Sequence, residues 1–115
     1  MNSQQATVII SGRLVDDPKV KQQKKAAVTV TEISVAVNGP GPEEVIFIDA
    51  AIFGENYAML LEENATKGTE IVVFGRLRQS RWKDDSGVSH SRHSVLASHL
   101  AVVPKPQQET AEKTA

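Results

Sequence analysis

The sequence contains no cysteine and few aromatic residues, with one tryptophan, one tyrosine and three phenylalanines among 115 residues. Without cysteine the chain forms no disulfide and no thiolate metal site, and it fits a reducing compartment. No apolar run approaches the roughly 20 residues that span a bilayer. Residues 1–12 lack the basic and apolar regions of a signal peptide. We therefore expect a cytoplasmic protein that makes no membrane contact.

The composition, with 40% hydrophobic and 23% charged residues, is that of an ordinary globular protein. A chain of this length forms one domain with a modest core, and we place that domain at residues 1–103. From Pro104 onward the sequence is polar and interrupted by proline. This composition predicts a disordered polar tail over residues 104–115.

Charge is segregated along the chain, although the formal net charge is only -1. Residues 19–25 (KVKQQKK) and 76–83 (RLRQSRWK) hold eight of the 13 basic residues and no acid. Residues 54–70 carry four glutamates and a single lysine. A segregated basic surface attracts polyanions whatever the total charge. The net charge therefore does not exclude a nucleic acid as the partner.

Alternation of apolar and polar residues dominates the sequence and predicts strands. Between the third and fourth strands, residues 54–68 have the only helical spacing of apolar residues and end at Gly68. In the second strand the apolar residues change phase between Val30 and Ile33, which predicts a β-bulge. The five predicted strands are residues 7–15, 26–37, 45–53, 70–82 and 91–103.

Three strands, one helix and two further strands follow the order of the OB-fold. Two of the strands contain a glycine, which is typical of sharply bent strands in small barrels. We therefore predict an all-β protein: a five-stranded OB-fold barrel with one helix between strands 3 and 4. A five-stranded sandwich with a surface helix is the alternative.

The fourth predicted strand places cations and the only tryptophan on one side. Alternation puts Arg76, Arg78 and Trp82 opposite the apolar residues of that strand. Phe47 and Phe53 likewise lie opposite the apolar face of the third strand. Exposed rings stack on bases of any sequence and cations follow phosphates, as single-stranded nucleic-acid binding requires. The apolar face expected in the core consists of Ile46, Ile48, Ala50 and Ile52.

Each of these residues also has a purely structural explanation. Phe47 and Phe53 could fill a second small core or a subunit interface. Arg76 and Arg78 could belong to a solvated strand face. Trp82 is harder to explain in this way, because it lies where the strand leaves the core and has a cation on each side. Taken together, the residues favour binding.

No catalytic or metal-binding constellation stands out. His93 and His99 share a predicted strand face but stand six residues apart at about 3.3 Å per residue, too far to bind one metal ion. The paired aspartates at 16–17 and 84–85 fall in turns, where aspartate bonds to the backbone. The sequence has no nucleophile elbow and no phosphate-binding glycine loop. We therefore expect no enzymatic activity, no metal and no cofactor.

The sequence resembles the bacterial single-stranded DNA-binding proteins over residues 6–103. The most specific segments are G-R-L-x-x-D-P (12–18), F-G (53–54), K-G-T (67–69) and G-R-L-R-x-x-x-W-x-x-x-S-G (75–87). The resemblance implies that Phe47, Phe53 and Trp82 stack on bases. It also implies that Lys67, Arg78 and Arg81 meet the nucleic-acid backbone.

The sequence departs from that family in three places. The loop at residues 38–44 is short and lacks an aromatic residue at its start, so one stacking platform is missing. Glu55 occupies a position where the family commonly has a basic residue. The tail lacks the acidic tip ending in Pro-Phe that recruits partner enzymes. We therefore expect a truncated chain or a specialised phage, plasmid or paralogous form.

We predict a non-enzymatic protein of the cytoplasm and nucleoid that binds single-stranded DNA in replication, recombination and repair, with no small-molecule substrate. The resemblance implies a homotetramer, with a dimer as the alternative, and replication proteins as further partners. The alternative function is a protein-interaction module of the primosomal type with weak nucleic-acid affinity. The predicted contacts are stacking by Phe47, Phe53 and Trp82, and phosphate binding by Arg13, Lys19, Lys21, Lys67, Arg76, Arg78, Arg81 and Lys83.

Overall fold

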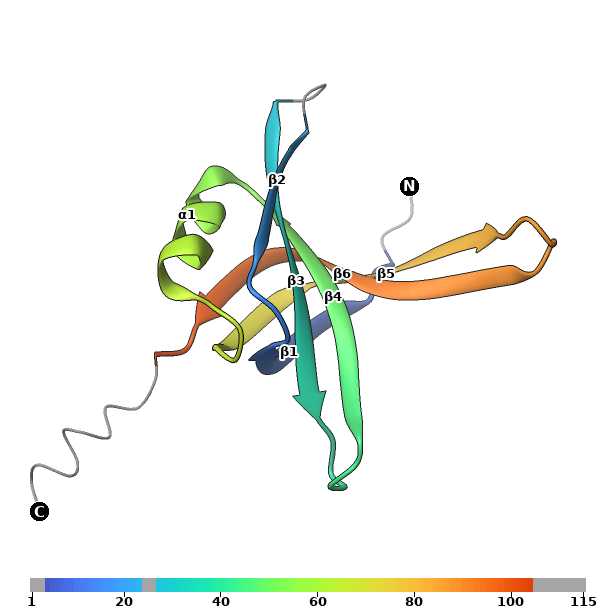
Figure 1. The fold of residues 1–115 in the computed structure, drawn as a ribbon, viewed down its shortest axis with the longest axis horizontal. Helices are drawn as coiled ribbons and strands as arrows, with labels where there is room; N and C mark the ends of the chain where they lie inside the picture. The colour runs from blue at the N-terminus through green and yellow to red at the C-terminus, as the bar shows by residue number, and fades with distance from the viewer. Residues whose placement is uncertain (1–3, 24–26, 105–115) are drawn as a thin grey trace, which may run out of the picture.

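The computed structural model describes residues 4–23 and 27–104. Of the predicted tail, only Pro104 belongs to these residues. These residues form four strands, one helix and two further strands in chain order, arranged as in Figure 1. The elements are β1 (Thr7–Leu14), β2 (Lys19–Gln23), β3 (Val28–Asn38), β4 (Val45–Phe53), α1 (Glu55–Asn64), β5 (Glu70–Lys83) and β6 (Ser89–Val102).

Five of the strands pair into a closed ring. Hydrogen-bonded neighbours follow the order β1–β5–β6–β4–β3. β3 returns to β1 through the pairs Arg13↔Ala36 and Leu14↔Val35. The ring, with the helix between β4 and β5, is the predicted barrel. β2 is an additional strand paired with β3, and alternation missed it because Val20 is its only apolar residue.

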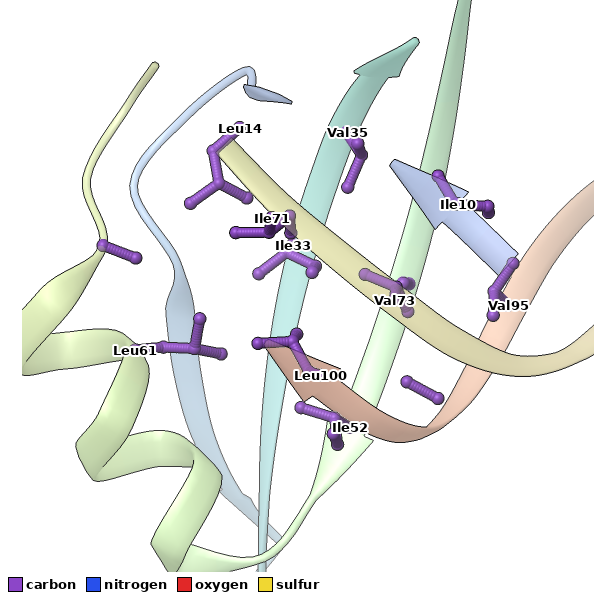
Figure 2. Close-up of a cluster of buried hydrophobic side chains, with 13 residues drawn as sticks. Ile10, Leu14, Ile33, Val35, Ile52, Leu61, Ile71, Val73, Val95 and Leu100 are labelled. Atoms are coloured by element: carbon purple, nitrogen blue, oxygen red, sulfur yellow. The ribbon is translucent and has the colours of Figure 1, made fainter. Parts of the chain in front are cut away.

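The core lies inside this ring and is capped by α1 (Figure 2). Leu61 of α1 points toward the cluster, which includes Ile71 and Leu100. α1 ends at Asn64, earlier than the predicted Gly68. A turn closed by a hydrogen bond from Thr69 N to Thr66 O follows it. The buried cluster consists of Ile10, Leu14, Ile33, Val35, Ala50, Ile52, Leu61, Ala65, Ile71, Val73, Val95, Ala97 and Leu100.

The β-bulge predicted within β3 is wrong. β3 pairs with β4 in one continuous register over residues 30–38. Thr29 and Thr31 are buried, and they lie on the same face of β3 as Ile33, because alternate residues of a strand share a face. The core face therefore continues through two threonines, and only its apolar character is interrupted.

The irregularity lies instead between β5 and β6. The register shifts between Phe74 and Gly75, leaving Ser98 as an extra residue in β6. A Cβ atom at Gly75 would lie 2.3 Å from a main-chain oxygen of β6, so the close approach requires glycine. The extra residue also reverses the alternation. His93 and His99, predicted to share a face, therefore pair with β5 residues on opposite faces.

The β5–β6 and β3–β4 hairpins both extend beyond the barrel (Figure 1). The longer one, which we call the arm, comprises residues 76–93 of β5, β6 and their turn. Nearly all of its residues are exposed. The shorter hairpin joins β3 to β4 and carries Ile46, which is 56% exposed rather than in the core. β6 pairs with β4 only over residues 49–52, so no strand of the barrel covers Ile46.

Candidate nucleic-acid interface

The predicted site residues can be placed by following register across the strands. Partners in register project to the same side of a sheet. Following them from β2 through β3, β4 and β6 to β5 defines one outer surface, which we call the front face. Two successive rows of this face are Ser34–Asp49–Ser94–Arg78 and Glu32–Ala51–Leu96–Arg76.

Three exposed aromatic rings lie on the front face. Phe47 is 69% exposed, Phe53 45% and Trp82 48%. Phe47 and Phe53 stand at opposite ends of β4, six residues apart, which corresponds to about 20 Å along a strand. Trp82 lies on the arm, four residues beyond Arg78. The three rings are therefore spaced along one surface and do not form a cluster of their own.

Trp82 is held in place by a contact across the arm. Its ring stacks on His90 with centroids 5.5 Å apart and planes inclined by 20°. His90 Nε2 lies 2.8 Å from Asp84 Oδ2, while Asp84 Oδ1 accepts the N–H groups of Ser86 and Val88. The bond to His90, followed by those from Ser86 and Val88, lowers the pKa of Asp84 from 3.8 to about 2. The predicted turn role of Asp84 is confirmed.

Four predicted cations also lie on the front face. Arg76 and Arg78 project from β5 and form no ion pair with any residue that the structure describes. Lys19 and Lys21 lie on β2. Lys21 is in register with the β3 residue that pairs with Phe53, so it lies two strands from that ring. Lys21 Nζ also forms a 2.9 Å ion pair with the carboxylate of Glu32.

The other predicted cations lie at the edge of the front face or behind the arm. Arg81 and Lys83 alternate with Trp82 and project from the reverse side of the arm. Together with Trp82 and His90 they border a hollow of about 550 Å³. Arg13 is two strands from Phe47 in register, and its Nη1 donates to Gly68 O at 3.4 Å. Lys67 lies in the same loop between α1 and β5. The structure therefore divides the predicted cations among three places.

Sequence reasoning missed two charged residues at the centre of the front face. Arg92 of β6 is in register with Ser80 and forms an ion pair with Asp49 of β4. Asp49 Oδ1 also accepts a hydrogen bond from Ser34 Oγ at 2.5 Å. The two charged residues are 43 positions apart in the sequence. Only the parallel pairing of β4 with β6 brings them together, so no local pattern could have found the pair.

Within residues 4–23 and 27–104, no group of three or more His, Cys, Asp or Glu side chains is arranged to hold a metal ion. The one helix found in these ranges is too short to cross a membrane. The front face itself carries exposed aromatic rings and charged side chains.

Comparison with known proteins identifies similar chains. The model of the "Single-strand binding protein family" matches residues 5–103. The chain is 33% identical over 103 residues to the single-stranded DNA-binding protein of Helicobacter hepaticus, covering 84% of this chain and 59% of that protein. It is 32% identical over 105 residues to the Helicobacter pylori protein of the same name, covering 85% and 58%. The chain thus spans about three fifths of the length of these relatives.

A solved structure shares the fold. The Plasmodium falciparum SSB in complex with ssDNA superposes with a TM-score of 0.77 at 17% identity, covering 90% of this chain and all of that one. This likeness confirms the predicted OB-fold, with β2 as an addition to the five predicted strands.

Proposed function

The chain belongs to the single-strand binding protein family, and we propose that it binds single-stranded DNA with little dependence on base sequence. One observation carries the proposal: Phe47, Phe53 and Trp82 are exposed on the same face as Arg76 and Arg78. Aromatic rings stack on any base and contribute about 1–3 kcal/mol per base. Cations between the rings neutralise the phosphates of the same strand.

The roles of the individual residues follow from their positions. Phe47, Phe53 and Trp82 serve as stacking platforms along the strand. Arg76 and Arg78 bind phosphates between them. The remaining contacts come from three other places: Lys19 and Lys21 on β2, Arg13 and Lys67 near the α1–β5 loop, and Arg81 and Lys83 on the reverse side of the arm.

The protein assembles as a homo-oligomer, with the tetramer favoured by the resemblance described above. The open edge of β1 supports self-association. β1 pairs with β5 over residues 7–13, but with β3 only at Arg13 and Leu14. Ile9 is 68% exposed beside its partner Phe74. An unpaired strand edge flanked by apolar side chains is a surface that a second copy can cover.

The activity is binding, without catalysis. Its setting is DNA replication, recombination and repair in the cytoplasm, with replication proteins as partners. The names of the relatives, single-stranded DNA-binding proteins, support the binding activity.

A protein-interaction module with weak nucleic-acid affinity is the second candidate. The acidic exposed side of α1, with Glu55, Glu62 and Glu63, favours it, since this surface repels DNA and is available to a basic partner. The variants Trp82→Ala and Phe47→Ala distinguish the two candidates. A DNA-binding protein loses several kcal/mol of affinity with both changes, whereas an interaction module keeps its partner.

Titration with dT oligomers of increasing length tests the main proposal. We expect Trp82 emission to be quenched on binding and the affinity to fall steeply with added salt. Unchanged Trp82 emission at low salt and saturating oligomer would rule out the assignment. Mass measurement of the free protein in the same buffer gives its oligomeric state.

A further inference from the structure

An acidic residue occupies the centre of the front face. Asp49 lies on β4, two residues from Phe47, and shares a cross-strand row with Arg78. Its side chain is 34% exposed. A phosphate chain that passes from Phe47 toward Arg78 must therefore cross this carboxylate.

Asp49 is held in that position by two partners. Ser34 Oγ donates a hydrogen bond to Oδ1, and the Arg92 guanidinium pairs with Oδ2. The side chain of Arg92 is 62% exposed, so it could reach a ligand if it were released. In the observed arrangement its charge is neutralised by Asp49. An exposed ion pair of this kind contributes little to stability, so the fold alone does not explain its presence.

The surroundings of Asp49 add further negative charge to the centre of the front face. A hollow of about 420 Å³ lies over this part of the front face. Four carboxylate side chains and only three cations line it. The cations are Lys19, Arg78 and Arg92, and the last of these is paired with Asp49. The centre of the front face is therefore not basic, although the residues predicted to bind DNA surround it.

We propose that Asp49 limits the affinity of the front face for single-stranded nucleic acid by holding Arg92 away from phosphate and by repelling the phosphate chain at the centre of the face. This inference rests on the proposed function and assigns a role within it. For Arg92 to bind a phosphate, it must leave Asp49, and the carboxylate is then unpaired beside the phosphate chain. The bound nucleic acid is therefore held mainly by residues around the centre of the face. It dissociates more readily than it would if Arg92 bound a phosphate.

The variant Asp49→Asn tests this directly. An asparagine oxygen can still accept the bond from Ser34 Oγ, but the charge is lost and Arg92 is freed. One additional phosphate contact on a single strand steepens the slope of log K against log salt by about 0.7. The gain in dT affinity of Asp49→Asn over the wild type should therefore be about fivefold larger at ~0.1 M salt than at 1 M. Fluorescence anisotropy of a labelled oligomer at several salt concentrations measures both quantities.

The reverse change gives a second, independent test. Arg92→Gln leaves the charge of Asp49 unpaired on the front face, so the affinity for dT oligomers should fall. The double variant Asp49→Asn/Arg92→Gln should bind with an affinity between those of the two single variants. Because the residues are in contact, their effects should not add. Arg92 is exposed, so its replacement tests the inference even if the Asp49 variant folds poorly.

Glu63→Gln is the matched control, because Glu63 is an exposed acid on α1, outside the front face. Asp49→Asn binding no more tightly than Glu63→Gln would overturn the inference while leaving the proposed function intact. A loss of dC affinity in Asp49→Asn would also overturn it, because the carboxylate would then be accepting a bond from the cytosine amine. If the wild type itself shows no salt-sensitive binding of dT oligomers, the proposed function and this inference both fail.

Discussion

The indole of Trp82 and the imidazole of His90 lie face to face across the β5–β6 arm, with ring centroids 5.5 Å apart. The imidazole covers one side of the indole, and 48% of Trp82 remains exposed. His90 is itself fixed by Asp84 in the turn. The platform proposed for base stacking is thus a three-residue unit built by two strands and their turn.

Replacement of His90 should weaken DNA binding without abolishing it. Without the stack, the indole of Trp82 gains freedom that it must lose on binding a base, and such aromatic contacts are worth roughly 0.5–1.5 kcal/mol. His90→Ala should therefore lower the affinity for dT oligomers several-fold and lower the steady-state anisotropy of Trp82 emission in the free protein. His90→Phe keeps a ring at this position and should restore both. Equal behaviour of the two variants would show that the stack does not position Trp82.

The pH dependence of the turn should report the lowered pKa of Asp84. Its folded-state pKa of about 2 lies below the ordinary value of 3.8, so the ionised carboxylate stabilises the turn. That contribution is fully present above about pH 4 and is lost as the pH falls toward 2. The amide protons of Ser86 and Val88, which donate to this carboxylate, should titrate with a midpoint of about 2. NMR measures the midpoint, and a value near 3.8 would contradict the hydrogen-bonded turn.

Two arginines of β5 should differ because they face opposite ways. Arg78 lies on the front face and Arg81 on the reverse side of the arm. Arg78→Gln should reduce the salt slope of dT binding by about 0.7, the value for one phosphate contact on a single strand. Arg81→Gln removes the same charge and should reduce it less. Equal slopes for the two variants would mean that DNA wraps around the arm and contacts both sides.

Replacement of Thr31 by valine should increase the stability of the folded protein. Its side chain is fully buried in β3, and its hydroxyl finds no hydrogen-bond partner among the described residues. Leaving such a group unpaired costs about 1–3 kcal/mol. Thr31→Val keeps the shape and removes the hydroxyl, so the melting temperature should rise by several degrees. A lower melting temperature in a calorimetric scan would indicate that the hydroxyl does have a partner.

The order of strands and helix and the side on which most site residues lie could be predicted from the sequence. Alternation is a local property, and it sorted Arg76, Arg78 and Trp82 from the core side of β5 correctly. The same rule failed at Thr31, because threonine can be buried where the rule expects an apolar residue. It also failed at Ser98, because an inserted residue is visible only against its partner strand.

Contacts between distant segments could not be predicted in this way. The pair formed by Asp49 and Arg92 depends on the parallel register of β4 with β6, and that register is set by closure of the barrel. Alternation within the predicted strand already separates Arg81 from Trp82, and only Lys83 lies beyond the predicted end of that strand. The local sequence pattern therefore shows which residues lie on the outer side of a strand. Strand pairing determines which of these residues contact each other.

The extra residue at Ser98 also constrains how the arm can change in length. On the barrel side of Ser98, Leu100 points into the core. On the arm side of Ser98, Val95 and Ala97 point into the core, and the residues that alternate with them lie on the front face. An extra residue in one strand is absorbed as a bulge, as at Ser98, whereas one residue added to both strands at the same level would turn the side chains beyond it to the other side. Trp82 would then leave the front face, and Arg81 and Lys83 would take its side. The arm can be lengthened or shortened only by two residues in each strand at a time if the same surface is to be kept.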